Sequence, residues 1–307
     1  MPTEIVKKMD WMRRASITLM ATMLLCLVIP TIAQGEVRRK AGLSMQSAGM
    51  GDATRATSVG HNALIHNPSG MSQVKAYQVT TGFGYSHLDL QASPTISFVD
   101  SLLNPMLAAG VGYTFRAASG YQGDGDRRRE HHTRGAISTG YSGQALGFYL
   151  GAGLNWLNMG VESGEADDFV AMDTSVTLVV LQTVRLAVVG HNLFPFTDMD
   201  PKGDMPRSLG TGVAANFGQF LLEFDTDTDF DTYSKPIASY HIGGQVLVIP
   251  TLPLRFGYAA DPGEEAHRLS GGIGYWTPQF MVDIGYQHNV QQSGDFTLGL
   301  DLVFALN

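Results

Sequence analysis

The sequence predicts an all-β fold, a transmembrane antiparallel up-and-down β-barrel of about fourteen strands. Three observations lead to this fold. The chain begins with a segment that has the features of an export signal. From about residue 76 onward, apolar and polar residues alternate in stretches of about ten. Short and long connections between these stretches alternate strictly, as in bacterial outer-membrane barrels.

Residues 1–33 are expected to form a cleaved secretory signal peptide. Basic residues come first, an apolar run over residues 17–29 follows, and small residues precede Gln34. A membrane helix needs about 20 residues, so this short run favours cleavage after Ala33 over retention as an anchor. Cys26, the only cysteine, lies inside this segment. The mature chain is therefore expected to have no disulfide, thiolate metal site or cysteine nucleophile.

The composition narrows the class of protein further. Glycine is abundant at 36 residues, and charged residues make up only 16% of the chain. The formal net charge of −8 argues against a nucleic-acid partner, because phosphate binding needs a concentrated basic surface. These features favour an exported, β-rich protein.

The strand segments are defined by alternation and are bounded by turn-forming residues. Segment 92–102 is the weakest, because it contains Pro94 and precedes the Asn104-Pro105 turn, and a partly helical form is its alternative. The strands are expected at residues 77–90, 92–102, 106–117, 132–142, 145–157, 169–181, 184–192, 207–217, 219–230, 237–249, 252–260, 268–276, 279–289 and 296–307.

The connections set the direction of the strands. Outer-membrane barrels have short periplasmic turns and longer outer loops. With the C-terminus in the periplasm, the longer polar connections all fall on the outside. This order requires a returning strand before residue 106, and segment 92–102 supplies it. The longer connections are residues 118–131, 158–168, 193–206, 230–236 and 261–267.

Each predicted strand has one apolar face and one polar or small face. In the last segment, Phe296, Leu298, Leu300, Leu302, Phe304 and Leu306 share one face, opposite Thr297, Gly299, Asp301 and Ala305. A soluble sandwich would turn the apolar faces inward, whereas a membrane barrel turns them to lipid, and alternation alone does not separate the two. The export signal, strands of about 9 to 11 residues and enough strands to close favour the barrel.

In a barrel the polar faces line a lumen. Charged side chains there cannot remain unpaired in an apolar interior, so they are expected to pair with each other, with the N-terminal segment or with water. The expected members are Asp173, Glu223, Arg255, Asp283 and Asp301.

The segment between the signal peptide and the first strand, residues 34–76, lacks the barrel pattern. It contains Gly49-Met50-Gly51-Asp52-Ala53 and Asn67-Pro68-Ser69-Gly70-Met71. These motifs resemble the N-terminal signature of the FadL and PorV group of outer-membrane barrels. The resemblance implies a barrel of this strand number, with the segment folded inside the lumen as a plug. The chain would then comprise a signal peptide (1–33), a plug segment (34–76) and a transmembrane barrel (77–307).

The residues of this segment suit a plug. Gly49, Gly51 and Gly70 allow close backbone approach and positive φ, and Asn67-Pro68 favours a turn. An irregular polar stretch at membrane depth is tolerated only inside protein or a wet cavity, which favours a plug over a turn that merely starts the first strand. For a hydrophobic ligand, the resemblance suggests contacts from Met45, Met50, Leu64, Ile65, Asn67, Pro68, Gly70 and Met71.

Four aspartates alternate in the stretch DTDTDFD and share one strand face: Asp225, Asp227, Asp229 and Asp231. Such a row repels itself unless a cation, a basic neighbour or water offsets it. Oxygen ligands suit calcium, but Phe230 and Pro236 stand where an EF-hand needs glycine and glutamate. A solvated rim near the outer loops is favoured, and a cation shared with lipopolysaccharide phosphates is the alternative. No dedicated metal site is predicted.

Two groups of histidines are weaker candidates. The stretch GDGDRRREHH, residues 123–132, lies in a predicted outer loop and suits binding of anionic lipid, a partner or a metal. A solvated loop of mixed charge explains it equally well. His61 and His66 are expected to make structural hydrogen bonds, because ligand pairs on a helix usually lie three or four residues apart.

No Ser-His-Asp arrangement, phosphate loop or metalloprotease helix is recognisable, so neither an enzyme nor a cofactor is predicted. Similarity to FadL implies passive transport of hydrophobic, fatty-acid-like molecules across the bacterial outer membrane. Similarity to PorV implies instead a barrel that binds another protein in secretion or surface assembly. A purely structural outer-membrane protein is the third interpretation. The expected partners are membrane lipid, lipopolysaccharide and the cargo, or a secretion or surface protein.

Overall fold

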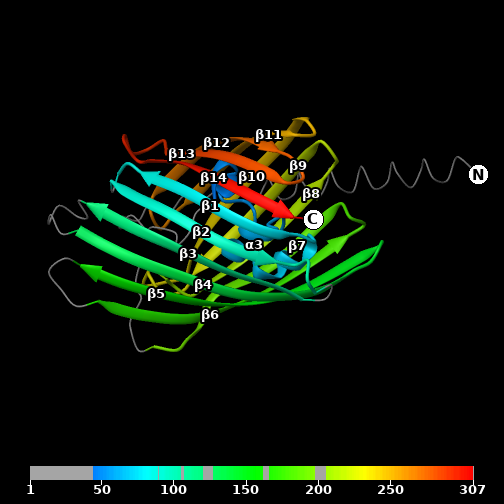
Figure 1. Cartoon of the computed structure of the whole chain (residues 1–307). Coiled ribbons are helices and arrows are strands. Elements are labelled where there is room, and N and C mark those ends of the chain that lie inside the picture. The colour runs from blue at the N-terminus through cyan, green and yellow to red at the C-terminus, as the bar shows by residue number, and fades with distance from the viewer. Residues whose placement is uncertain are drawn as a thin grey trace, which may run out of the picture. The chain divides into compact units, whose positions relative to one another are not determined.

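A closed β-barrel forms most of the chain. The computed structural model describes residues 44–88, 90–104, 107–119, 127–161, 166–197 and 205–306, and the predicted signal peptide and its cleavage site lie outside them. Each strand pairs antiparallel with its neighbours in sequence, and β1 closes the barrel on β14 (Figure 1). The predicted barrel and its strand number are confirmed.

The strands follow the predicted segments closely. Strand β2 is a complete strand of 10 residues, so the partly helical alternative is wrong. The strands are β1 (Tyr77–Ser86), β2 (Gln91–Asp100), β3 (Leu107–Ser119), β4 (Arg127–Ser142), β5 (Leu146–Val161), β6 (Asp167–Val180), β7 (Val184–Pro195), β8 (Ser208–Asn216), β9 (Phe220–Asp229), β10 (Ile237–Ile249), β11 (Leu252–Asp261), β12 (Ala266–Trp276), β13 (Phe280–Asn289) and β14 (Phe296–Leu306).

Strand β4 corrects one prediction. The sequence predicts a loop over residues 118–131, but β4 pairs with β3 as far as Arg127, opposite Ser119. Within this charged stretch, Glu130 is buried in the lumen and forms an ion pair with Arg116 of β3, with 3.0 Å between Oε2 and Nη1. A polar lumen accepts charge at every inward position, so a charged run here remains a strand. The first part of the predicted loop stretch, residues 120–126, lies outside the described residues.

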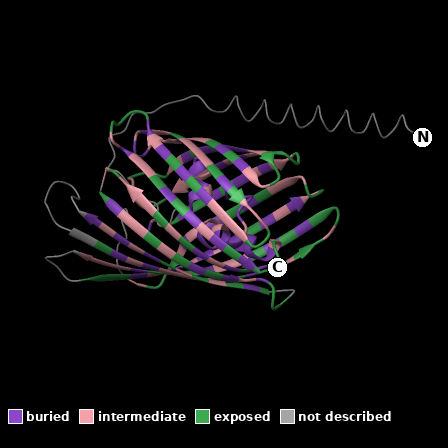
Figure 2. Ribbon diagram, turned by 45° about the horizontal axis from the view of Figure 1, so that its top comes forward, coloured by how far each residue is buried: buried purple, intermediate pink, exposed green. Residues whose placement is uncertain are grey.

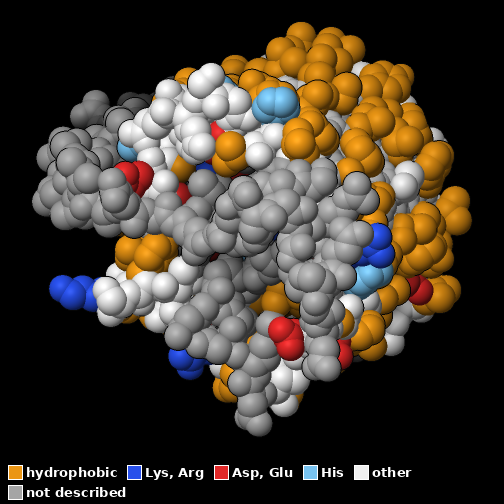
Figure 3. All heavy atoms as spheres, turned by 90° about the vertical axis from the view of Figure 1, so that its left-hand side faces the viewer, with side chains coloured by type: hydrophobic (Ala, Val, Ile, Leu, Met, Phe, Trp, Pro, Cys, Tyr) orange, Lys and Arg blue, Asp and Glu red, His pale blue; other side chains and the backbone are white. Residues whose placement is uncertain are grey.

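The barrel is apolar outside and polar inside. On β14, Leu298 and Phe304 are 45% and 53% exposed, whereas Asp301 between them is 5% exposed. Buried and exposed residues alternate along the strands in Figure 2. Hydrophobic side chains cover much of the visible outer wall in Figure 3, which looks onto the end that carries the longer loops. A soluble sandwich would bury these side chains, so the surface is one that contacts lipid.

Three short helices precede β1 and lie in the lumen: α2 (Met45–Gly49), α3 (Gly60–His66) and η1 (Pro68–Gln73) (Figure 1). The Ser44 side chain caps α2 by accepting from the Ser47 N–H, and Asn67 caps η1 by accepting from the Ser69 N–H. Pro68 suits the first turn of η1, where a missing N–H leaves no partner unsatisfied. None of the described helices is long and apolar enough to cross a membrane.

The wall is irregular at two places that face these helices. Two residue pairs, or rungs, are missing from the β2–β3 ladder, at Ser93 and Pro94 of β2. The register is the same on both sides of this gap. Proline has no N–H, so Pro94 donates nothing to the carbonyl of Phe115 opposite. Between β6 and β7, a bulge beside Asp173 includes Asn192 at φ 54°. Bulges turn side chains in new directions, and this one aims the Asn192 N–H at the carboxylate of Asp173.

Candidate functional site at the plug and the lumen wall

The segment inside the lumen is held by two kinds of contact, and we name its parts accordingly. The charged half, residues 44–58, is bound mainly by carboxylates of the wall. The hydroxyl half, residues 59–73, is bound mainly by serine and threonine hydroxyls. The two halves also contact different strands, because α2 packs mainly against β13 and β12, and η1 packs mainly against β4 and β5.

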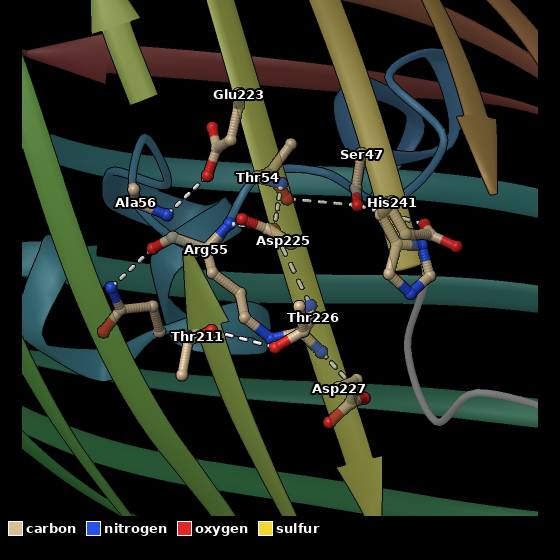
Figure 4. A network of polar contacts seen from close by, with 12 residues as sticks. Ser47, Thr54, Arg55, Ala56, Thr211, Glu223, Asp225, Thr226, Asp227 and His241 are labelled. Atoms are coloured by element: carbon tan, nitrogen blue, oxygen red, sulfur yellow. Dashed lines mark hydrogen bonds and ion pairs between the residues drawn. The ribbon is translucent and has the colours of Figure 1, made fainter. Parts of the chain in front are cut away.

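Carboxylates on β9 hold the charged half by its backbone. Asp225 accepts hydrogen bonds from the N–H groups of Thr54 and Arg55, at 2.8 and 2.9 Å (Figure 4). Glu223 accepts from the Ala56 N–H at 2.5 Å. Hydrogen bonds from backbone N–H groups to carboxylates are stronger than neutral ones. The irregular backbone of this half therefore has partners inside the barrel.

A guanidinium and a second wall strand complete the attachment. Nη2 of Arg55 lies 2.7 Å from Oδ2 of Asp227, and Nη1 lies 3.6 Å from Oδ2 of Asp225. On the last strand of the barrel, Asp301 accepts from the Met45 N–H at 2.7 Å. The charged half thus spans the lumen from β9 to β14.

These contacts correct the interpretation of the aspartate row as a solvated rim. Asp225 is fully buried beneath the plug. The basic neighbour that offsets Asp225 and Asp227 is Arg55, which is distant in sequence. Near the outer loop, Asp231 pairs with Arg207 at 2.7 Å. In the described part of the chain, no group of three or more histidine, cysteine or acidic side chains is arranged to hold a metal ion.

Two glycines allow the plug to fold tightly against the wall and against itself. Gly51 has φ +65°, and a Cβ atom there would lie 2.7 Å from the backbone nitrogen of Tyr258 on β11. A Cβ atom at Gly70 would lie 2.0 Å from the carbonyl oxygen of Ser58. Any side chain at either position would displace backbone.

Neutral hydrogen bonds hold the hydroxyl half. The Asn67 side-chain amide donates to the hydroxyl of Thr177 on β6 at 2.8 Å. The hydroxyls of Ser69 and Thr177 are 2.7 Å apart, and those of Ser72 and Ser138 on β4 are also 2.7 Å apart. All five side chains are buried. Each such bond adds about 1 kcal/mol, less than a bond to a charged group.

Helix α3 has two further contacts with the wall. Nδ1 of His61 lies 2.6 Å from the hydroxyl of Ser97 on β2. The Arg134 guanidinium of β4 donates to the carbonyl oxygen of Ile65 at 2.8 Å. His61 lies outside the membrane-spanning strands, and burial lowers its pKa to about 4, so its imidazole is neutral at neutral pH.

The other lumen carboxylates pair within the wall. Nη1 of Arg255 lies 2.7 Å from Oδ1 of Asp283, and the guanidinium stacks on Trp276 at 5.0 Å. At the β6–β7 bulge, Asp173 accepts from the Asn192 N–H at 2.7 Å. The structure therefore places all five predicted lumen residues inside the barrel, and it brings Glu223 and Asp301 to the plug.

A pocket lies between α3 and the wall strands β2, β3 and β4. Together with its opening to solvent it measures about 280 Å³, but the part that a water molecule can occupy is about 10 Å³. One side is apolar, with Leu64 and Ile65, and the other carries hydroxyls, imidazoles and a guanidinium. Thr95 and Thr114 join across the lumen side of the wall beside the missing β2–β3 rungs, with 3.0 Å between hydroxyls. The lining residues are His61, Leu64, Ile65, Thr95, Ser97, Gly112, Tyr113, Thr114, His132 and Arg134.

The predicted ligand-contact residues are distributed over several environments. Leu64 and Ile65 line the pocket, and Met71 packs with Leu64 in an apolar cluster against β2, β3 and β4. Met45 and Met50 are buried against the wall instead, and the residues of the Asn67–Met71 turn are buried in η1 contacts. Of the polar residues of the pocket, the sequence predicted roles for His61 and His132. Thr95, Ser97, Thr114 and Arg134 were missed, although alternation places them on the inward faces of their strands.

No protein-family model matches the sequence, and no curated protein matches it significantly. Solved structures share its fold. The CymD monoaromatic hydrocarbon channel is 16% identical with a TM-score of 0.58, over 88% of this chain and 98% of that one. The Pseudomonas putida toluene transporter TodX is 15% identical with a TM-score of 0.53, over 91% and 99%. A TodX mutant channel has a TM-score of 0.57 at 15% identity, over 87% and 99%.

The comparisons confirm the predicted resemblance at the level of the fold, which this chain shares with CymD and TodX. The lipid-contacting outer surface agrees with the predicted location in the bacterial outer membrane.

Proposed function

We propose that this barrel lets hydrophobic small molecules diffuse passively across the outer membrane. The pocket between α3 and the wall is a binding site on their path. The pocket is the observation on which the proposal rests. The similar structures CymD, a monoaromatic hydrocarbon channel, and TodX, a toluene transporter, add support. The proposal takes residues 1–33 as a removed signal peptide and residues 34–76 as the plug.

The pocket chemistry favours a cargo with an apolar body and a polar or acidic end. Leu64 and Ile65 offer an apolar side. Arg134 and the imidazoles of His61 and His132 face the same space and match a carboxylate. A fatty-acid-like molecule contacts both sides, whereas a pure hydrocarbon complements only the apolar side.

The path out of the pocket is inferred from the wall. The pocket has room for about 10 Å³, close to the space of a single water molecule, so α3 must move to admit any cargo. The missing rungs at Ser93 and Pro94 lie beside it, next to the paired residues Thr95 and Thr114, and interrupt the backbone ladder of the wall. We infer that cargo passes sideways between β2 and β3.

Engineered disulfides test this path in proteoliposomes. The mature chain is expected to have no cysteine of its own. A pair of cysteines that replaces Ser72 and Ser138 therefore forms one disulfide, which locks the hydroxyl half to β4. The matched control is a pair of cysteines replacing Gly160 and Ala166, whose Cβ positions lie 3.8 Å apart, which forms a disulfide within the wall and leaves the plug unattached. Uptake of a labelled fatty acid is measured before and after reduction.

We expect the first lock to reduce fatty-acid uptake to the level of protein-free vesicles and reduction to restore it. The control lock should leave uptake unchanged. Toluene, tested in parallel, should enter more slowly than the fatty acid. Equal uptake with both locks closed would contradict the role of the hydroxyl half, and equal rates for both cargoes would contradict the acidic-end specificity.

Two further variants separate the wall route from the alternatives. Pro94→Ala supplies an N–H for the missing rungs and should slow uptake. Deletion of residues 42–72 removes most of the plug segment and should accelerate uptake. Negligible uptake by the native chain and by both variants would end the transport proposal and favour a barrel that binds another protein.

A further inference from the structure

The histidines are distributed asymmetrically over the barrel. Five of the nine lie in the plug or the lumen, and the other four lie on the outer surface. All four are at the barrel end that carries the longer loops, the end that faces outside the cell in outer-membrane barrels. We name them the rim histidines: His87, His131, His267 and His288.

Each rim histidine packs against an outward aromatic ring. The ring of His87 stacks on Phe296 with centroids 4.8 Å apart and planes at 9°. The ring of His288 stacks on Tyr286 at 6.4 Å and 13°. Tyr286 also lies 6.0 Å from Phe296, with the ring planes at 34°, so these four rings form one cluster across β13, β14 and the end of β1.

The other two rim histidines have a tyrosine hydroxyl on one ring nitrogen. The Tyr113 hydroxyl lies 2.7 Å from Nδ1 of His131, and the Tyr258 hydroxyl lies 2.5 Å from Nδ1 of His267. A tyrosine O–H that donates to Nδ1 leaves the imidazole proton on Nε2. The Nε2–H group is then available to a partner beyond the protein. Arg129, exposed and outward on the same strand as His131, adds a positive charge.

The opposite rim provides an internal comparison. Outward aromatic residues occur there too, including Tyr77 and Tyr141, but the described chain places no histidine among them. Aromatic rings at both membrane interfaces are ordinary for barrels, whereas a hydrogen-bonding and chargeable group on one rim only points to the chemistry of one leaflet.

We propose that the rim histidines and their aromatic partners bind the phosphorylated sugar headgroup of an outer-leaflet glycolipid. The stacked rings offer flat apolar faces to the sugar rings. The Nε2–H groups and Arg129 donate hydrogen bonds to the phosphate oxygens. This surface is independent of the pocket and of the transport proposal.

Native mass spectrometry of the full chain in nonionic detergent tests the proposal. The two probes are diphosphoryl lipid A and the same lipid with both phosphates removed. The native chain should retain the phosphorylated form about fivefold better or more. A variant with all four rim histidines changed to phenylalanine keeps the rings and should lose this preference. The matched control, Tyr77→Phe with Tyr141→Phe, should keep it.

A milder variant covers the case in which the fourfold change prevents folding. Tyr113→Phe with Tyr258→Phe leaves every histidine in place but removes the hydroxyls that orient two of them, and it should reduce the preference partly. If the native chain retains both lipids equally, or if the fourfold variant folds and keeps the preference, the proposal is wrong.

Discussion

The two halves of the plug are attached to the same barrel by different chemistry. The charged half rests on buried carboxylates, with Asp225 accepting two backbone N–H groups and facing Arg55. The hydroxyl half rests on neutral pairs such as Ser72 with Ser138. Removing one partner from a buried charged group costs several kcal/mol, whereas a neutral hydrogen bond contributes about 1 kcal/mol. The difference indicates a fixed anchor joined to a part that can be released.

The largest expected effect comes from breaking the anchor. Asp225→Ala leaves the backbone N–H groups of Thr54 and Arg55 without their acceptor and removes one of the carboxylates beside a buried guanidinium. We expect the free energy of unfolding to fall by about 3–5 kcal/mol. Urea titration of the protein in lipid vesicles measures it.

The matched control is Asp231→Ala, a change in the same aspartate row. Its partner Arg207 has a side chain that is 52% exposed, and exposed ion pairs contribute at most about 1 kcal/mol. Equal losses for the two variants would show that burial of Asp225 gives the charged half no special hold.

Acid should release the hydroxyl half selectively. His61 has a pKa of about 4 when α3 is docked and about 6.5 when it is exposed, so above pH 6.5 both states are neutral. Between these values only the released state takes up a proton, and docking weakens by about 3 kcal/mol as the pH falls to 4. Hydrogen exchange at residues 60–66, corrected for its intrinsic pH dependence, should show this loss.

His61→Asn should flatten the pH profile. Part of the slope should remain, because burial also lowers the pKa of His66 on the same helix. The amides of residues 50–56 serve as the internal reference, and if they lose protection over the same pH range, the two halves respond as one unit.

The smallest expected effect comes from single hydroxyls. Ser72→Ala should weaken docking of the hydroxyl half by about 1 kcal/mol, and a double-mutant cycle with Ser138→Ala should recover that energy as coupling. Thr211→Val is the control, because Thr211 forms a similar 2.8 Å hydroxyl pair with Thr226 on the outer face of the wall. A coupling energy near zero would contradict the assignment of these hydroxyls as tethers.

The fold could be predicted because the side-chain period of a strand is visible in sequence. The alternation from Phe296 to Leu306 fixes both faces of β14, and turn order fixes the strand number. The same rule failed at residues 127–131, where a run of charges is typical of a loop in water. The run nevertheless continues as strand β4, because Glu130 turns inward to pair with Arg116 in the lumen while Arg129 is exposed at the outer rim.

The site was less accessible to sequence reasoning. Arg55 and Asp225 are far apart in the chain, and nothing local marks them as partners. A serine such as Ser138 looks the same whether it tethers a plug or faces water. Met50 was expected at a ligand, but the tight approach of Gly243 and Gly257 buries it against the wall. Contacts between distant segments decide such roles, and periodicity carries no information about them.

The hydrogen bond from Met45 to Asp301 joins the first described helix to the last strand of the chain. Its acceptor lies on the strand that pairs with β1 and so closes the barrel. The plug precedes every strand in the chain, yet it can form this bond only once β14 stands beside β1. A plug held by this bond therefore reports that the wall is closed.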